Sequence, residues 1–439
     1  MTAMPAAEQG HELHRIVIVG GGMGGLVTAT HLARRLRGSG KAEILLIDRN
    51  RAHVWKPMLH TFAAGTSDYA NENVSFIPHA KLTGYKYWPG DFGGLDRKTQ
   101  TIKLKPTPLP AAGEMLPGTT IHYDTLILAL GSQVNDFGTP GVLEHCHFID
   151  DIGQATAFND LLRSRVVLAA NAGEDLDVVI VGGGATGVEL AAELTQRMVI
   201  ISRYDSNVTR THLHLTLIET TSRVLGPFPE KISHSVEAKL RSLGVGVRTD
   251  TKVVGVDAQG VSLDGNRRIE AALVIWAAGV KAPAAMSNLD GVEISRRGQA
   301  LVVDTLQTKG DERIFALGDC SDLAGSDGKP LPSTAQVARQ QALFLAKSLA
   351  GHITRGAPLG HFKYRDMGSL VALGEYAAYG TLGSYGFLKG AACKGWLAHM
   401  GHSALYRMHQ LDINGPVRGL VIWLAANLRR LVEPRVRTS

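Results

Sequence analysis

The sequence has few cysteines, and none of them form a recognisable pair. Cys146, Cys320 and Cys393 are far apart along the chain, and no Cys-x-x-Cys occurs. This spacing argues against a disulfide scaffold, an iron–sulfur or zinc ribbon and a redox-active dithiol, and favours reduced thiols in the cytoplasm. The runs 145–147 (His-Cys-His) and 399–402 (His-x-x-His) offer too few ligands at suitable spacing, so we predict no metal site.

Long apolar runs and targeting signals are also lacking. No stretch approaches the roughly 18 apolar residues that a membrane-spanning helix needs, so we expect no membrane crossing and therefore no proton pumping. Residues 1–15 have neither the apolar core of a secretory signal nor the composition of a transit peptide. Acidic residues are scarce in one region: residues 355–439 hold 11 of the 46 Lys and Arg residues but only 4 of the 40 Asp and Glu residues. The net charge of +6 therefore comes from this region, and either a nucleic acid or an anionic lipid surface would explain it.

Glycine is abundant, with 50 residues in a chain of 439, a length that predicts two or three domains. The β-branched run 16–19 predicts a buried strand, which leads into a Gly-rich turn and then a helical pattern from Leu26. In that context the G-x-G-x-x-G spacing predicts a dinucleotide site. Gly20 permits the tight turn, Gly22 lets backbone approach a pyrophosphate, and Gly25 lets the helix pack on the strand. Asp48, which ends the next strand, is placed to accept a hydrogen bond from a ribose hydroxyl.

The same pattern returns at Asp177. Gly182, Gly184 and Gly187 repeat the spacing between a strand and a helix, and Glu219 ends the following strand. An acidic residue there favours NADH, because a 2′-phosphate would meet a negative charge. The interval before Glu219 is long, and the polar stretch 202–211 has the character of an insertion. Two dinucleotide sites in one chain predict electron transfer between a bound flavin and a nicotinamide.

Three further strand ends and one loop are candidate cofactor contacts. Residues 74–130 are expected to form short strands separated by turns. Strands running into small-residue turns precede Gly131 and the pair Ala278–Gly279, which suits close approach of backbone to a cofactor. Gly318 and Asp319 follow another strand, and Asp319 is expected either to hold the ribityl chain of a flavin or to cap its own helix. The apolar segment 49–65, which includes Lys56, is expected to wall the first cofactor pocket or to pack as a loop on the first domain.

Two helical patterns near the end of the chain allow more than one interpretation. Gln336 and Gln340 share a helix face, and from spacing alone they form an ordinary polar stripe. From Pro416 onward, one helix face is apolar (Leu420, Trp423, Leu424, Leu428, Leu431) and the other basic (Arg418, Arg429, Arg430). This pattern is typical of a helix lying on an anionic membrane surface. Packing on its own domain or on a second subunit is the alternative.

These features together resemble the type II NADH dehydrogenases, which are monotopic, non-pumping NADH:quinone oxidoreductases. The more specific matches are 53–65 (HVWKPMLHTFAAG), 187–194 (GVELAAEL), 335–340 (AQVARQ) and 405–410 (LYRMHQ), the last similar to the enterobacterial branch. The resemblance implies FAD on the first glycine turn with Asp48, Gly318 and Asp319, and NADH on the second. It places Gln336 and Gln340 beside the quinone head, and Glu189 between the nicotinamide and quinone regions. Met367 departs from the family, which often has a lysine there.

We therefore predict an α/β protein with two Rossmann-like dinucleotide-binding domains and a C-terminal amphipathic, membrane-docking segment. The expected boundaries are 1–150 and 291–365 for the FAD-binding domain, 151–290 for the NADH-binding domain and 366–439 for the docking segment. The expected enzyme is a respiratory NADH:quinone oxidoreductase, peripheral on the cytoplasmic face of the bacterial inner membrane, with no nucleic acid partner and with a homodimer left open. A sulfide:quinone oxidoreductase, a soluble reductase of a ferredoxin-type partner and a flavin-binding scaffold without turnover are the alternatives.

Overall fold

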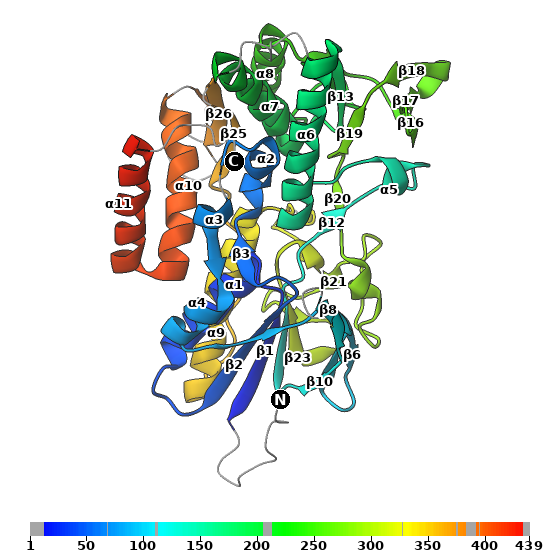
Figure 1. Ribbon diagram of the computed structural model, residues 1–439. Coiled ribbons are helices and arrows are strands. Elements are labelled where there is room, and N and C mark those ends of the chain that lie inside the picture. The colour runs from blue at the N-terminus through cyan, green and yellow to red at the C-terminus, as the bar shows by residue number, and fades with distance from the viewer. Residues whose placement is uncertain are drawn as a thin grey trace. The chain divides into compact units, whose positions relative to one another are not determined.

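The chain forms two compact units, each assembled from separate segments (Figure 1). The structure, a computed structural model, describes residues 13–67, 69–109, 113–204, 213–326, 328–374, 376–382, 392–394 and 396–432. Within these, the first unit holds 13–53, 74–132 and 282–364, and the second holds 54–73, 133–281 and 365–432. The strands β3 (Ala52–Val54) and β4 (Asn73–Ser75) lie where the chain passes between units. The segments 54–73 and 365–432 thus group with the expected NADH-binding domain, a division that differs from the expected boundaries.

A six-stranded sheet organises the first unit. Its order is β22-β23-β11-β1-β2-β5, and every neighbouring pair is parallel except β22–β23. Ile16 to Val19 in the central strand are at most 2% exposed. Such a continuous apolar run is what a parallel strand covered on both faces requires. The strands are β1 (His14–Val19), β2 (Ala42–Asp48), β5 (Lys86–Pro89), β11 (Thr125–Leu128), β22 (Gln307–Thr308) and β23 (Asp311–Ala316).

Two long helices of the first unit pack against each other, α1 (Met23–Leu36) and α9 (Ala335–Arg355). Thr334 caps α9 by accepting a hydrogen bond from the Val337 N–H at 3.3 Å. Smaller antiparallel pairings complete the unit: β6 (Phe92–Asp96), β7 (Thr101–Leu104) and β10 (Thr120–His122); β8 (Thr107–Leu109) with β9 (Glu114–Leu116). The short parallel pair is β21 (Ala300–Leu301) with β24 (Ser321–Asp322).

One expectation for this unit is wrong. The sequence pattern predicted only short strands across 74–130, but α4 (Phe76–Thr83) is a helix. Proline is tolerated in the first helical turn, where Pro78 lies, and Gly84 ends the helix in the left-handed conformation with φ 102°. An eight-residue helix gives too short a periodic signal to stand out from alternating strands.

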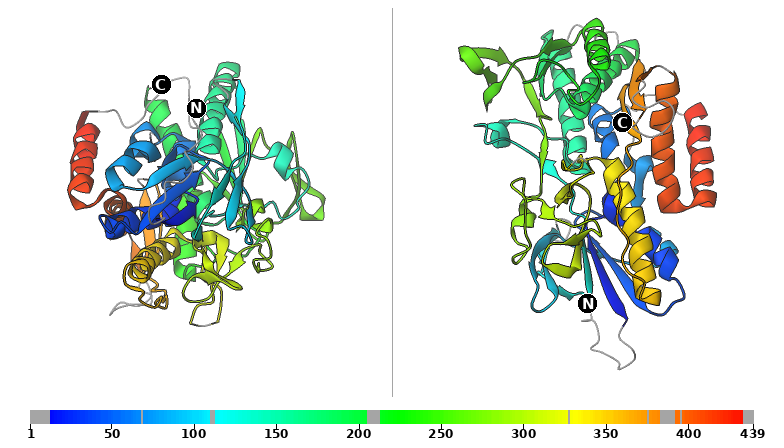
Figure 2. Two further views of the ribbon diagram at one scale, coloured as in Figure 1. Left: turned by 90° about the horizontal axis from the view of Figure 1, so that it is seen from below. Right: turned by 180° about the vertical axis from the view of Figure 1, so that it is seen from behind.

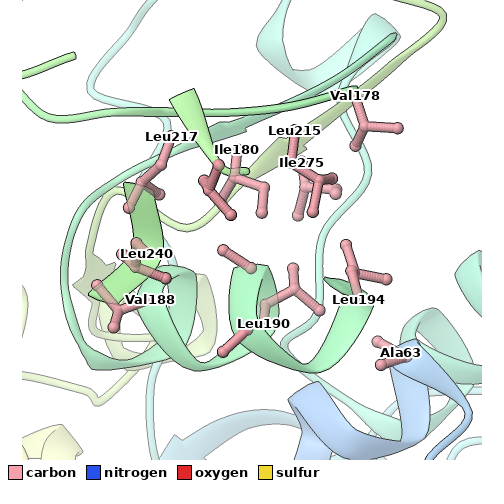
Figure 3. Close-up of a cluster of buried hydrophobic side chains, with 14 of the residues drawn as sticks. Ala63, Val178, Ile180, Val188, Leu190, Leu194, Leu215, Leu217, Leu240 and Ile275 are labelled. Atoms are coloured by element: carbon pink, nitrogen blue, oxygen red, sulfur yellow. The ribbon is translucent and has the colours of Figure 1, made fainter. Parts of the chain in front are cut away.

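The second unit contains a four-stranded parallel sheet in the order β15-β14-β13-β19. Figure 3 shows its core: Ile180, Leu217 and Ile275 of the sheet face Val188, Leu190 and Leu194 of the helix α7. The strands are β13 (Leu176–Val181), β14 (Leu213–Ile218), β15 (Gly246–Arg248) and β19 (Leu273–Trp276), and α7 spans Ala185–Tyr204. Most of the expected insertion, 205–212, lies outside the described residues.

The segment 54–73 joins this core. Leu59, Phe62 and Ala63 of α2 (Leu59–Ala64) are buried in the same apolar cluster as α7 and β25. The Asn159 amide on α6 (Ile152–Ala172) donates to the Ala63 carbonyl at 3.0 Å. The remaining elements are α3 (Tyr69–Glu72), β12 (Gln133–Val134), α5 (Val142–His145), α8 (Glu230–Ser242), β16 (Val253–Asp257), β17 (Gly260–Leu263), β18 (Arg267–Glu270) and β20 (Val280–Lys281).

The C-terminal part adds a small sheet and two helices to the second unit. The sheet consists of β25 (Gly368–Leu373), β26 (Ala377–Leu382) and β27 (Ala392–Lys394), and α10 (Trp396–Asn414) packs on it. The helix α11 (Pro416–Val432) lies beside α10 (Figure 2). Among the described residues, no helix is both long and apolar enough to cross a membrane.

Candidate functional site

In the first glycine turn, close packing requires two of the glycines, and the third lies beside open space. Gly20 has φ 104°, and a Cβ there would lie 2.2 Å from the Ala129 carbonyl oxygen. A Cβ on Gly25 would lie 1.7 Å from the Gly20 oxygen, so any side chain would push α1 off β1. Gly22, at the N-cap of α1, has no atom within 4 Å of its Cβ position. Two glycines therefore serve the packing, and the third leaves a helix N-terminus accessible to an anion.

Asp48 holds this turn in place. Its Oδ2 accepts from the Gly21 N–H and its Oδ1 from the Asn50 N–H, each at 2.6 Å. Burial raises the pKa of Asp48, and the two backbone hydrogen bonds oppose that shift. On the other side of the turn, the buried His53 donates from Nδ1 to the Gly21 carbonyl at 2.8 Å, and burial lowers its pKa to about 4. Gly21 is thus fixed on both sides: the Asp48 carboxylate holds its N–H and a neutral imidazole holds its carbonyl.

The second glycine turn has the same construction. A Cβ on Gly182 (φ 115°) would lie 2.4 Å from the Ala277 oxygen, and one on Gly187 would lie 2.0 Å from the Gly182 oxygen. Gly184 again has nothing within 4 Å. Glu219 Oε2 accepts from the Gly183 N–H at 2.8 Å, as Asp48 does for Gly21. Its Oε1 accepts from the Thr221 N–H at 2.8 Å.

Two further loops of the first unit meet, one after β11 with Gly131 and one after β23 with Gly318 and Asp319. Gly131 and Gly318 have φ values of 68° and 71°. The Ser132 hydroxyl donates to Asp319 Oδ2 at 2.7 Å, so the carboxylate faces the loop after β11. The Gly318 N–H donates to Oε1 of the buried Gln341 at 2.7 Å, a contact that the sequence analysis missed.

The same helix, α9, carries Gln336 and Gln340, both half-buried. The Tyr364 hydroxyl donates to Gln336 Oε1 at 2.6 Å. Twenty-eight residues separate the two, so no spacing rule links them. Met367, where the family often has a lysine, is 62% exposed.

In the second unit, Ala278 and Gly279 form the turn after β19. Gly279 has φ 148°, and its carbonyl accepts from the Asn135 N–H at 3.0 Å. Lys56 lies in this unit as well, with its Nζ 2.5 Å from Asp150 Oδ1. Asp150 Oδ2 also accepts from the Val134 N–H at 3.2 Å. An ion pair thus occupies Lys56, and its expected contact with the first cofactor stays a prediction.

Three charged residues of α7 are buried in a row. Glu189, Glu193 and Arg197 are 8%, 8% and 5% exposed, at intervals of four residues. The Thr66 hydroxyl donates to Glu193 at 2.6 Å, and Arg197 donates to the Ala64 carbonyl at the end of α2. Glu193 and Arg197 therefore each have a hydrogen-bond partner from the segment 54–73.

Glu189 is the most perturbed of the three. Its Oε1 accepts from the Ala372 N–H of β25 at 3.0 Å, and its Oε2 lies 3.6 Å from Nδ1 of the buried His60 on α2. Burial raises the pKa of Glu189 to about 8, helped by the neighbouring Glu193 and opposed by the Ala372 hydrogen bond. The carboxyl is therefore mostly protonated at neutral pH. A perturbed carboxyl beside a histidine is the chemistry of a proton carrier.

The cysteines whose side chains are described are poor nucleophiles. Burial raises the pKa of Cys146 to about 12 and that of Cys320 to about 11. The Cys320 thiol contacts the Leu128 and Leu317 carbonyls. Neither residue is a ready thiolate at neutral pH.

Comparisons with known proteins agree on one group. Residues 14–342 match the pyridine nucleotide-disulphide oxidoreductase family. A type II NADH:quinone oxidoreductase of Haemophilus influenzae is 35% identical, with 97% of this chain and 100% of the relative covered.

Two solved structures show the same fold. The first is an NDH2 of Plasmodium falciparum in complex with NADH, with a TM-score of 0.80 at 19% identity over 97% of this chain and 100% of that one. The second is a sulfide:quinone oxidoreductase of Aquifex aeolicus, with a TM-score of 0.72 at 18% identity over 96% of each chain. These likenesses concern the fold alone.

Substitution by alanine should have different effects at the packed glycines and at the open ones. Gly25→Ala and Gly187→Ala should destabilise the protein by about 1–3 kcal/mol, because the new methyl group meets backbone oxygen. Gly22→Ala and Gly184→Ala should leave the thermal unfolding of the cofactor-free protein nearly unchanged, yet lower the flavin content and the NADH affinity, respectively. Melting temperature, flavin per polypeptide and NADH titration measure the three quantities. A strongly lowered melting temperature of cofactor-free Gly22→Ala would contradict the assignment of an open position.

Proposed function

Since the chain belongs to the pyridine nucleotide-disulphide oxidoreductase family and, within it, to the type II NADH:quinone oxidoreductases, we propose how its own residues carry out the family's reaction. The protein oxidises NADH and reduces a quinone to quinol, with FAD as its cofactor. The assignment of this function to particular residues rests on one observation. The two glycine turns, one in each unit, have the same construction. FAD, when bound, supplies the two-electron chemistry, and the protein supplies binding, orientation and protons.

The first turn is the proposed FAD site. Gly22 leaves the N-terminus of α1 open for the pyrophosphate, and Gly20 and Gly25 permit the close packing behind it. Asp48 retains further acceptor capacity for a ribose hydroxyl, because each carboxylate oxygen has two lone pairs. Gly131, Gly318 and Asp319 form the proposed contact for the remainder of the flavin, and Lys56 is a further candidate.

The second turn is the proposed NADH site. Gly182, Gly184 and Gly187 repeat the geometry of the first, and Ala278 and Gly279 form the neighbouring turn. Glu219 is the proposed ribose acceptor, and its charge disfavours the 2′-phosphate of NADPH. Support comes from the Gly183–Glu219 hydrogen bond, which keeps the carboxylate at the turn.

Gln336 and Gln340 are the proposed quinone contacts. Amide side chains can donate to a quinone carbonyl without carrying a charge into an apolar site. The Tyr364 hydroxyl, bonded to Gln336 Oε1, orients that amide so that its NH2 group is directed away from the tyrosine. We therefore add Tyr364 as a positioning residue of this site.

An anaerobic experiment tests the function. The purified holoprotein should lose its flavin absorbance on addition of NADH and recover it on addition of a short-chain quinone. Bleaching by sulfide in place of NADH would instead identify a sulfide:quinone oxidoreductase, which the two buried thiols disfavour. No bleaching by either donor would leave a flavoprotein without this activity.

Glu189 is the proposed proton carrier. Conversion of NADH and quinone to NAD⁺ and quinol consumes one proton from solvent in addition to the hydride. Glu189 is buried, holds a proton at neutral pH and has His60 as a titratable neighbour 3.6 Å away. Deprotonation of the carboxyl would leave a buried charge with one backbone donor, the Ala372 N–H. Because such a charge is costly, the carboxylate should be reprotonated rapidly.

Glu189→Gln keeps the shape of the side chain and removes its proton. We expect wild-type quinol formation to decline as the pH rises through about 8, and the variant to be roughly 100-fold slower without this inflexion. Stability gives a second readout: the unfolded carboxyl ionises near 4.5 and the folded one near 8, so wild-type stability falls with pH across that window and the variant lacks this slope. Glu193→Gln, on the same helix, is the control: it should keep the inflexion and move it to lower pH, because Glu193 helps to raise the Glu189 pKa. An unchanged pH–rate profile in Glu189→Gln would eliminate the proposed role.

The helix α11 is the proposed membrane-docking element, on the cytoplasmic face where NADH is available. Apolar side chains are exposed nearly all around it: Val417, Leu420, Val421, Ile422, Trp423, Leu424 and Leu428 are 37–75% exposed. Gly419 provides the contact with Leu411 of α10. The side chains of Arg429, Arg430 and Leu431 lie outside the described part. Such exposure is unusual on a protein that meets only water. The alternative is that the apolar surface of α11 forms the interface of a homodimer.

A further inference from the structure

A second exposed apolar surface lies in the first unit, on the helix α4. Phe76, His79, Ala80 and Thr83 face the interior. The opposite face carries Ile77 and Leu82, which are 70% and 51% exposed, together with Pro78 and Lys81. Positions i, i+1, i+4 and i+5 share one side of a helix, so the two aliphatic groups belong to one face.

The end of α1 places cations beside this face. Arg37 donates to the Leu82 and Thr83 carbonyls at 3.4 and 3.1 Å, and so ties the end of α1 to the end of α4. Arg34 and Arg35 are exposed on the last turn of α1. Segments 34–41 and 76–86 together contain six Lys and Arg residues and no Asp or Glu. We call Ile77, Lys81 and Leu82 with Arg35 and Arg37 the α4 surface.

The nearest acid along the sequence does not neutralise this surface. Glu43 lies two residues beyond the first segment, and its carboxylate binds Arg15 at 2.5 Å and Lys86 at 2.7 Å. Both partners, Arg15 and Lys86, lie outside the α4 surface. Among the described residues, Arg35, Arg37 and Lys81 form no ion pair, and the carbonyls that Arg37 contacts leave its charge in place.

Exposure of aliphatic residues alone would not distinguish α4. On α6, Val167 and Leu168 are 63% and 61% exposed. The stretch 160–175 around them, however, contains three acids against two arginines. Apolar exposure together with an excess of basic residues in the flanking segments is the property that sets the α4 surface apart from the exposed face of α6.

We propose that the α4 surface docks on anionic lipid and gives the first unit a membrane contact of its own, in addition to α11 in the second unit. This inference rests on the proposed membrane docking. Aliphatic side chains of an interfacial helix enter the boundary between headgroups and acyl chains, and arginines extend along it with their charges at the phosphates. An acidic protein surface would match the charge, but its acidic residues would provide no apolar surroundings for Ile77.

Flotation of the full-length holoprotein with vesicles tests this contact. The vesicles are phosphatidylcholine with and without phosphatidylglycerol. The double variant Ile77→Ser/Leu82→Ser should bind the anionic vesicles about tenfold more weakly, and Arg35→Gln/Lys81→Gln about fivefold more weakly for each charge removed. Val167→Ser/Leu168→Ser on α6 is the matched control and should bind as the wild type does. Activity with a soluble quinone should remain unchanged in all three.

The possible results separate the two proposals. Wild-type binding that is lost in Leu420→Ser/Leu424→Ser and unchanged in both α4-surface variants would overturn this inference and leave docking by α11 standing. Absence of wild-type binding to either vesicle would overturn both. Equal weakening in the α6 control would show a non-specific effect of exposed aliphatic residues, and a changed oligomeric state in Ile77→Ser/Leu82→Ser would show a protein interface; either contradicts the lipid contact.

Discussion

A carboxylate at the end of a strand, bound to the backbone of a glycine turn, is the interaction on which both proposed cofactor sites depend. Asp48 accepts from Gly21 and Glu219 accepts from Gly183, each with its other oxygen bound to its own loop. These bonds fix the turn before any ligand arrives, so little ordering remains to be done on binding. The accessible helix N-terminus and the acid are thereby held at one edge of each parallel sheet.

The second unit contains a different arrangement of charge, buried and close to its core. Glu189, Glu193 and Arg197 lie on the helix whose apolar side packs under the sheet in Figure 3. Buried charges are costly unless they are paired, and the segment 54–73 provides hydrogen-bond partners for Glu193 and Arg197. Glu189 avoids this cost by holding its proton. Glu189 lies less than two turns after Gly184, where α7 begins. Its proton is therefore held on the same helix that bears the proposed NADH site.

Much of this follows from the sequence, because the relevant signals are local. Apolar runs predicted the parallel strands, and the spacing of Gly20, Gly22 and Gly25 predicted which glycines pack and which stays open. The sequence did not predict the helix α4, because eight residues give little periodic signal. Gln341, Tyr364 and His60 were also missed, because their partners lie 23, 28 and 129 residues away, and only the folded chain brings such groups together.

The most direct test asks whether each acid serves its own cofactor. Asp48→Asn and Glu219→Gln keep the shape of the side chains and remove the charge together with one of the two acceptor oxygens. The measurement is flavin per polypeptide together with NADH affinity in both variants. Asp48→Asn should lose flavin and bind NADH normally where flavin remains, whereas Glu219→Gln should keep its flavin and bind NADH about tenfold more weakly. Loss of the same cofactor in both variants, or of neither, would contradict two separate dinucleotide sites.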